Sequence, residues 1–178
     1  MSNDQIRIGP YQYIHVQDRM KNVTRLESGP QNFTKKDHEV VIVGKDQPAN
    51  YVFMRPYEYC VINDPVMRDP KDKSLIIDKH GQIKLKIGDS EIRTALDYSE
   101  PFPLYPGEAL TKREQMPAIP RDCALKLEVL RDFTAEVGGK AIKYVAGFEW
   151  LEFGPKIYTP RVEVKIVTLI KPTTILAH

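Results

Sequence analysis

Apolar and polar residues alternate along several short segments of this chain. The clearest run is Ile83-Lys84-Leu85-Lys86-Ile87, and the same alternation returns at 125–129 and 162–166. A period of two is typical of a strand with one buried face and one face in water. We therefore expect the charged residues of these runs to face solvent, namely Lys84, Lys86, Lys126, Glu128, Glu163 and Lys165.

Turn-forming residues separate these runs. Lys79-His80-Gly81 predicts a hairpin between strands at 74–78 and 82–87, and Val137-Gly138-Gly139-Lys140 predicts a second hairpin turn. Fourteen prolines and ten glycines are spread along the 178 residues. Each proline removes a backbone donor and disfavours helix in the residue before it, so a helix is possible only at 107–115. The pattern predicts an all-β chain.

One nine-residue segment occurs twice. Leu26-Glu27-Ser28-Gly29-Pro30-Gln31-Asn32-Phe33-Thr34 returns as Leu151-Glu152-Phe153-Gly154-Pro155-Lys156-Ile157-Tyr158-Thr159, and weaker similarity links the segments that begin at Pro10, Pro56 and Pro120. Self-similarity of this kind predicts a repeat architecture. We expect a tandem array of about three small antiparallel β-sheet units stacked end to end. The expected bounds are 1–50, 51–116 and 117–172, with 173–178 as the start of a further repeat or a tail.

Glycine and proline mark the expected junctions between the strands of each unit. Glycine can take backbone conformations closed to other residues, and the residue before proline is pushed toward an extended backbone. An ordinary loop is the alternative. The predicted structural repeat junctions are Gly9, Pro10, Gly29, Pro30, Pro56, Pro106, Gly107, Pro120, Gly154 and Pro155.

Alternation also predicts which side chains form the core. Phe148, Trp150 and Glu152 should share one strand face. Two aromatic residues on one face could form a peptide groove, but the core of a small β unit is the favoured interpretation. The predicted core residues are Tyr13, Tyr59, Leu85, Leu127, Phe148, Trp150 and Val164.

Composition describes an ordinary globular chain. Hydrophobic residues make up 42% and charged residues 28%, and the net charge is +2. This balance does not indicate direct nucleic-acid binding, and no run approaches the ~18 apolar residues that a membrane span needs. Cys60 and Cys123 both lie in strand-like runs and are expected to be buried free thiols, which favours a reducing, cytoplasmic setting.

Candidate chemistry is sparse. His15, His38, His80 and His178 stand in four unrelated contexts, and no Cys or His pair has metal-ligand spacing. The sequence contains no nucleophile elbow, P-loop or dinucleotide fingerprint. A calcium site is the best metal candidate, but a solvated hairpin insertion is favoured because the spacing of the acidic residues departs from a calcium loop; these are Asp64, Asp69, Asp72 and Asp78. We expect no enzymatic activity, no cofactor and no metal.

The chain resembles a known family. Pro101-Phe102-Pro103-Leu104-Tyr105-Pro106-Gly107-Glu108, preceded by Glu91-Ile92-Arg93, is similar to the N-terminal repeat region of the major vault protein family. Further similarity lies at 8–16, 63–66 and 146–151, so the resemblance covers about residues 6–175. The insertion at 69–73 departs from the family pattern and leaves loop-level partner contacts open.

The resemblance implies a structural role. The chain would be part of a stave in a large hollow ribonucleoprotein shell, the vault particle, with these repeats near the waist of the particle. The implied partners are copies of the same protein, as lateral neighbours and in the opposite half-shell. Other implied partners are a poly(ADP-ribose) polymerase-type subunit and, only indirectly, a small untranslated RNA. The alternative is an independent β-repeat adaptor that binds peptides or proteins along an exposed edge or an aromatic groove.

Overall fold

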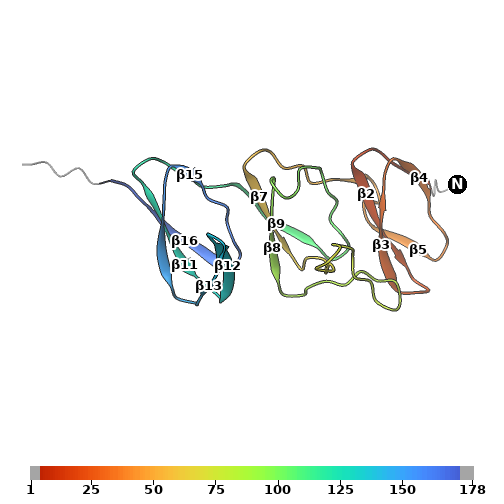
Figure 1. Cartoon of the computed structure of the whole chain (residues 1–178). Coiled ribbons are helices and arrows are strands. Elements are labelled where there is room, and N and C mark those ends of the chain that lie inside the picture. Colours follow the sequence, from red (N-terminus) through yellow and green to blue (C-terminus); the bar gives the residue numbers. More distant parts are fainter. Residues whose placement is uncertain (1–4, 173–178) are drawn as a thin grey trace, which may run out of the picture. The chain divides into compact units, whose positions relative to one another are not determined.

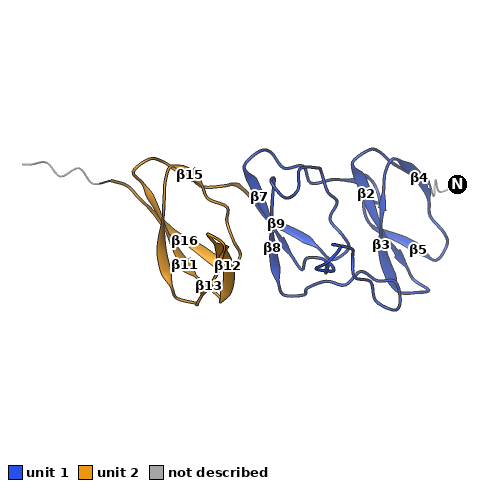
Figure 2. Cartoon of the chain, in the orientation of Figure 1, with its two compact units in different colours: residues 1–113 blue, residues 114–178 orange. Residues whose placement is uncertain are grey.

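The computed structural model describes residues 5–172, and within that range the chain forms sixteen β-strands and no helix (Figure 1). The all-β prediction is confirmed. The chain divides into two compact units, residues 1–113 and residues 114–178 (Figure 2). Unit 1 contains two groups of strands. We call residues 5–50 the first repeat and residues 51–115 the second repeat, although the last two residues of the second repeat, 114 and 115, are assigned to unit 2. Unit 2 contains the third repeat (118–170).

The first repeat is built around one central strand. That strand, β2 (Gln12–Asp18), pairs antiparallel with β3 (Val23–Ser28) on one side and with β5 (Glu39–Val43) on the other. Short β6 (Ala49–Asn50) also pairs with β2. A separate two-stranded sheet joins β1 (Gln5–Ile8) to β4 (Gln31–Thr34).

The second repeat keeps the same plan with fewer regular strands. Its central strand β7 (Glu58–Asn63) lies between β8 (Ser90–Thr94) and β9 (Ala109–Gln115). A single bridge, Val52 to Phe102, takes the place of the β1–β4 sheet. The possible helix at 107–115 is therefore wrong: the segment is a strand, since its backbone pairs with β7.

The third repeat shows the plan again. The central strand β11 (Ala124–Val129) lies between β14 (Glu149–Phe153) and β16 (Val164–Ile170), and β10 (Ala118–Ile119) pairs with β15 (Lys156–Ile157). The β2–β5 and β11–β16 pairs both contain a register shift at the same place, between His15 and Val16 and between Lys126 and Leu127. The repeated sequence thus encodes a repeated topology.

A tight turn precedes each central strand. The amides of Gln12, Glu58 and Cys123 donate to the carbonyl oxygens of Gly9, Arg55 and Pro120, three residues earlier. The third residue of each turn has a positive φ: 55° at Tyr11, 63° at Tyr57 and 62° at Asp122. Pro10 and Pro56 occupy the second position, where proline presets φ for such a turn. These turns explain the weaker similarity between the three segments.

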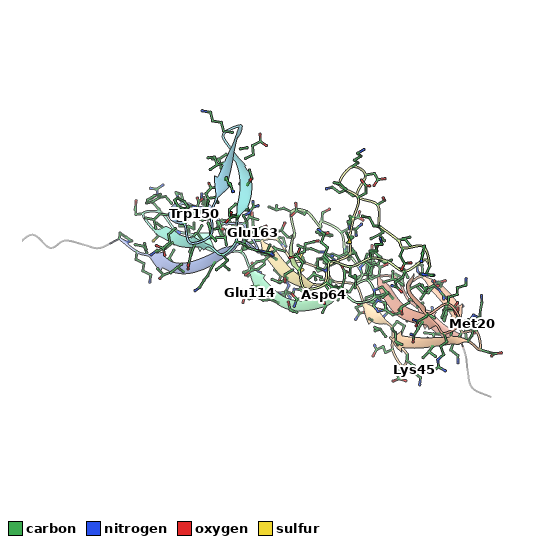
Figure 3. All side chains as sticks on the ribbon, turned by 90° about the horizontal axis from the view of Figure 1, so that it is seen from below. Met20, Lys45, Asp64, Glu114, Trp150 and Glu163 are labelled. Atoms are coloured by element: carbon green, nitrogen blue, oxygen red, sulfur yellow. The ribbon has the colours of Figure 1, made fainter. Side chains whose placement is uncertain are left out.

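The long insertions of the second and third repeats differ in form. Predicted strands 74–78 and 82–87 do lie antiparallel, through a bridge between Ile77 and Ile83. Their pairing is limited to isolated bridges, and a third segment around Met67 bonds to both of them. The amide of Met67 donates to Lys84 O, that of Lys84 to Ile76 O, and that of Ile76 to Met67 O. In the third repeat the insertion is the regular hairpin β12 (Phe133–Val137) and β13 (Lys140–Tyr144), which turns at Gly138-Gly139 as predicted. Figure 3 shows this hairpin standing away from the sheet near Trp150.

Gly29 and Gly154 allow two backbones to approach closely. A Cβ on Gly29 would lie 1.9 Å from Gly9 O, and a Cβ on Gly154 would lie 2.1 Å from Pro120 O. Both glycines precede a cis proline, and neither has a positive φ. Their role is therefore steric access rather than an unusual backbone conformation. The equivalent residue of the second repeat is Ala95, whose amide donates to Glu58 O as the amide of Gly29 donates to Gln12 O.

Each repeat has its own small core. The clusters centre on Ile14 and Val16, on Cys60 and Ile62, and on Leu125 and Leu127. Of the predicted core residues, Tyr13, Tyr59, Leu127 and Val164 are buried, while Leu85 and Trp150 are half-buried. Phe148 is wrong as a core residue, because 52% of its surface is exposed. It immediately precedes β14, and its ring stacks on that of Trp150 with the centroids 6.2 Å apart.

Candidate functional site

An ion-pair group with one buried carboxylate lies in the first repeat. Arg25 donates from Nε to Glu27 at 2.7 Å and from Nη2 to Glu39 at 2.8 Å. The Glu39 side chain is only 3% exposed. Burial acts to raise the pKa of Glu39, but the Lys36 amide and the Arg25 guanidinium outweigh it, so the pKa is lowered. The carboxylate therefore stays charged inside the repeat.

The second repeat holds a more deeply buried version of this group. Arg93 donates from Nε to Glu91 at 2.9 Å and from Nη2 to Glu108 at 2.5 Å, and the Arg93 and Glu108 side chains are 1% and 0% exposed. The guanidinium also lies 5.1 Å from the Phe102 ring centroid and 5.3 Å from that of Tyr98. Burial acts to lower the pKa of Arg93, but its bonds to Glu108 and Glu91 outweigh it and the pKa is raised.

The strand positions of arginine and glutamate are exchanged between these two groups. Counted from the equivalent Gly29 and Ala95, Arg25 occupies the place of Glu91, and Glu27 the place of Arg93. Both arrangements place one arginine between two glutamates. In the third repeat the same positions hold Trp150 and Glu152, whose side chains hydrogen-bond at 3.1 Å. The group therefore belongs to unit 1, and unit 2 replaces it with an aromatic cluster.

The first and second repeats meet within unit 1 at a polar and apolar joint. His15 Nε2 lies 2.7 Å from Leu104 O, the Thr24 amide donates to Gln82 Oε1 at 2.7 Å, and the Tyr51 amide donates to Tyr11 O at 2.8 Å. Because a carbonyl oxygen only accepts, His15 is the tautomer that carries its proton on Nε2. These bonds fix β2 and β3 of the first repeat against two loops of the second.

A groove of about 680 Å³ runs along this joint. Tyr13, His15, Ile42 and Val43 line one wall, and the other wall is formed by residues 82–87 and 104–108. Burial lowers the pKa of His15, partly offset by the Leu104 carbonyl and by the charge of Glu108. Burial likewise raises the pKa of Tyr13. Both rings are therefore uncharged at neutral pH.

Unit 2 carries an aromatic cluster with a shallow groove of about 350 Å³. Phe133 and Tyr144 stack with ring centroids 4.8 Å apart, and Phe148 stacks on Trp150 at 6.2 Å. Trp150 and Phe148 do share one face, as the alternation predicted. Arg161 lies 4.5 Å from the Phe133 centroid. The cluster covers one side of the third core and leaves its outer edge in solvent.

The candidate calcium ligands all accept from backbone amides: Asp69, Asp72 and Asp78 do so within their own turns, and Asp64 does so from an amide 24 residues away. Asp64 Oδ1 accepts from the Gly88 amide, Asp69 from Lys71, Asp72 from Ser74, and Asp78 from both His80 and Gln82. Over residues 5–172, no three His, Cys, Asp or Glu side chains are grouped so that they could hold a metal ion. In that same range, no helix is long and apolar enough to cross a membrane.

The predicted histidines and junction residues lie apart. His15 is in the joint, His38 lies 3.8 Å from Asp18, and His80 follows the Asp78 turn; His178 and the expected further start at 174–175 lie outside the described residues. Among the junctions, Gly9 meets Gly29 and Pro120 meets Gly154. Pro106-Gly107 forms the turn in which the Glu108 amide donates to Tyr105 O, with φ 96° at Gly107.

Sequence reasoning missed the buried charges. Arg25-x-Glu27 and Glu91-x-Arg93 place opposite charges two residues apart, hence on one strand face. That spacing was a usable signal. Glu108 and Glu39 gave no such signal, because their partners are distant in the sequence.

Known proteins are similar to this chain over nearly its whole length. Residues 52–113 match the family described as the Major Vault Protein repeat domain. The chain is 44% identical over 172 residues, 96% of its length, to "Major vault protein beta" of Dictyostelium discoideum, of which it covers 20%. It is 43% identical over 176 residues to "Major vault protein" of Gallus gallus, and 42% identical over 171 residues to that of Mus musculus; these matches cover 98% and 96% of this chain and 20% and 19% of the relatives. The chain thus spans about a fifth of the length of the curated relatives it matches, and it belongs to the major vault protein family of repeat proteins.

Proposed function

We propose that this chain is a structural component of a self-associating vault-type shell and performs no chemistry of its own. The observation that carries this proposal is the repetition of one strand plan three times in a chain that is 44% identical to a major vault protein over 96% of its length. Tandem repeats present extended surfaces rather than a single enclosed pocket.

The arrangement of charged groups supports a structural role. Arg25 pairs with Glu39 and Arg93 with Glu108, and each of these two glutamates also accepts from a backbone amide of a turn, so the groups tie strands to turns. A catalytic group needs a position from which it can reach a substrate. The buried carboxylates instead accept hydrogen bonds from backbone amides and arginines of their own repeat.

The finer features of this role rest on the family resemblance. We place the repeats near the waist of a hollow ribonucleoprotein particle, in contact with lateral neighbours and with the opposite half-shell. A poly(ADP-ribose) polymerase-type subunit would be a further partner, and a small untranslated RNA an indirect one. Buried Cys60 and Cys123, both free thiols, support a cytoplasmic location.

An adaptor role is the second candidate, favoured by one observation. The aromatic groove of unit 2, lined by Tyr144, Phe148 and Trp150, leaves apolar surface in solvent. Such a surface could receive an apolar side chain of a peptide. The family membership weighs against this role, since the similarity extends over the whole chain rather than over the groove.

A chimera would separate the two roles. The matching fifth of the Dictyostelium discoideum major vault protein beta is replaced by this chain, and the purified product is viewed by negative-stain electron microscopy beside the unaltered parent. Hollow particles like those of the parent support the shell role. A chimera that stays soluble but forms no particle, while the parent does, contradicts it. Substituting Trp150→Ala in the chimera serves as the adaptor control, because the shell role does not require the outer edge of the groove.

A further inference from the structure

One carboxylate lies at the centre of three separate segments of the second repeat. Glu108 Oε1 accepts from the Val66 amide at 3.0 Å and from Arg93 Nη2 at 2.5 Å, and Oε2 accepts from the Tyr105 amide at 3.0 Å. The Glu108 side chain is fully buried. Burying a carboxylate without partners is very costly, so the three donors and the carboxylate hold one another in place.

Two of these segments lead directly to the joint with the first repeat. Tyr105 follows Leu104, whose carbonyl oxygen accepts from His15. Val66 bridges to Leu85, which lines the groove at the joint, and the neighbouring amide of Met67 donates to Lys84 O. The loop that contains Leu85 also contains Gln82, which accepts from the Thr24 amide. The two segments of the second repeat that face the first, 82–87 and 104–108, are therefore anchored on the same carboxylate.

The equivalent glutamate of the first repeat lacks this connection. Glu39 Oε2 accepts from the Lys36 amide at 3.0 Å, and Oε1 accepts from Arg25. Glu39 thus closes its own turn and pairs with its own arginine, as Glu108 does with Tyr105 and Arg93. The additional bond of Glu108, to Val66, joins the insertion at 64–89 to the turn at 105–108.

We propose that Glu108 is the positioning residue of this joint: it sets the spacing of the two loops of the second repeat that dock on the first. The three hydrogen bonds of Glu108 lie within the second repeat, so it positions the first repeat through Leu104 and Leu85, in addition to the effect of its charge on His15. This inference stands independently of the assembly role proposed above, because it concerns the register of two repeats within one chain.

Amide hydrogen exchange on the whole chain, measured by NMR, tests the proposal with Glu108→Gln and its matched control Glu39→Gln. A glutamine has one accepting oxygen, so its NH2 group must face either the Tyr105 amide or the Val66 amide. The segment on that side then loses its acceptor. In Glu108→Gln we expect the Thr24 amide to exchange about tenfold faster, and the ring nitrogens of His15 to show mixed tautomers. The amides of Ile14 and Cys60 should change less than about threefold. Glu39→Gln should speed exchange at Lys36 and leave Thr24 and His15 unchanged.

Two results would overturn the proposal. One is release of Val66 or Tyr105 in Glu108→Gln with Thr24 and His15 both unaffected. The other is an equal effect at Thr24 in Glu39→Gln. If Glu108→Gln does not fold, native-state exchange of the unaltered chain in mild denaturant decides. The amides of Thr24, Val66 and Tyr105 should then become exposed to exchange together, at a lower denaturant concentration than the amides of strand β7. Opening of Thr24 independently of Val66 and Tyr105 contradicts the role of Glu108.

Discussion

Gly29 and Gly9 are both followed by proline, yet they should respond very differently to an added methyl group. A Cβ on Gly29 would lie 1.9 Å from Gly9 O and 2.7 Å from Ile8 O, where ordinary contacts begin at 3.4 Å. A Cβ on Gly9 would meet Gln12 Oε1 at 2.8 Å, the end of a flexible side chain that can move aside. The pair therefore separates steric access from the general effect of replacing glycine.

The cost of Gly29→Ala follows from what must move. Relieving the contact requires the two backbones to separate by about 1.5 Å, in an interior that is packed without room for it. Overpacking of this kind costs about 1–3 kcal/mol. Ile8, buried at the end of the β1–β4 ladder, would shift with Gly9 and weaken its pairing with Gln31, at a further cost of about 1 kcal/mol. We expect Gly29→Ala to lower the free energy of unfolding by about 3 kcal/mol.

Urea unfolding of Gly29→Ala and Gly9→Ala, followed by circular dichroism, provides the assay. Gly9→Ala should cost less than about 1 kcal/mol. Gly154→Ala should resemble Gly29→Ala, because its Cβ would lie 2.1 Å from Pro120 O, with the loss felt in unit 2. Equal destabilisation by Gly29→Ala and Gly9→Ala would refute the steric argument, as would a cost below about 0.5 kcal/mol for Gly29→Ala.

Three further predictions follow from the charged groups. Arg93→Met leaves Glu108 buried without its cation and should lower the free energy of unfolding by about 3–5 kcal/mol. Lys126→Met breaks the pair with Glu149, whose side chains are 34% and 46% exposed, and should cost less than about 1 kcal/mol. Similar losses for the two variants in urea titrations would contradict the burial of the Arg93–Glu108 pair. Burial lowers the pKa of His15, so its contribution to stability is complete above the unfolded pKa of about 6.5 and is lost as pH falls through the lower folded pKa. His15→Gln should flatten the stability profile below about pH 6.5, and an unchanged slope would contradict this. Calorimetry with calcium, zinc and magnesium should detect no stoichiometric micromolar site, because Asp64, Asp69, Asp72 and Asp78 already accept from backbone amides; saturable binding that Asp78→Asn abolishes would contradict this assignment.

The sequence predicted the fold through its local patterns. Period-two alternation at 125–129 placed Leu127 in the core, and Gly138-Gly139 correctly predicted a hairpin turn. The insertion at 64–89 was harder to predict, because its three segments bond in a cycle through Met67, Ile76 and Lys84. Alternation describes strands within a sheet and says nothing about such a closed arrangement.

The buried charges illustrate a different limit. Glu108 is fully buried although charged residues are normally exposed, and its partners Val66 and Arg93 lie 42 and 15 residues away. Only the three-dimensional structure brings them together. Phe148 shows the converse error: alternation gave its strand face correctly, but whether that face is covered depends on where the β12–β13 hairpin ends.

The role of Gly154 also needed the structure. The Gly-Pro pair predicted a junction, and glycine there suggested an unusual backbone. The structure shows no positive φ at Gly154, which instead lies close to two carbonyl oxygens, those of Ile119 and Pro120. Those residues precede Gly154 by more than thirty positions, so the reason for the glycine is tertiary rather than local.

We propose that these repeats supply structure to a larger assembly and that their own contacts are too weak for the repeats to assemble alone. Stable association usually buries about 800 Å² on each partner, and the edge strand β9 carries Lys112, Arg113 and Glu114, charges that oppose edge pairing. Weak contacts of this kind act through multivalency in a longer chain. Sedimentation velocity of the 178-residue chain at micromolar concentration is the most direct test. We expect a monomer or a weak, concentration-dependent association, whereas a closed ring or large particle formed by residues 1–178 alone would show that these repeats assemble by themselves.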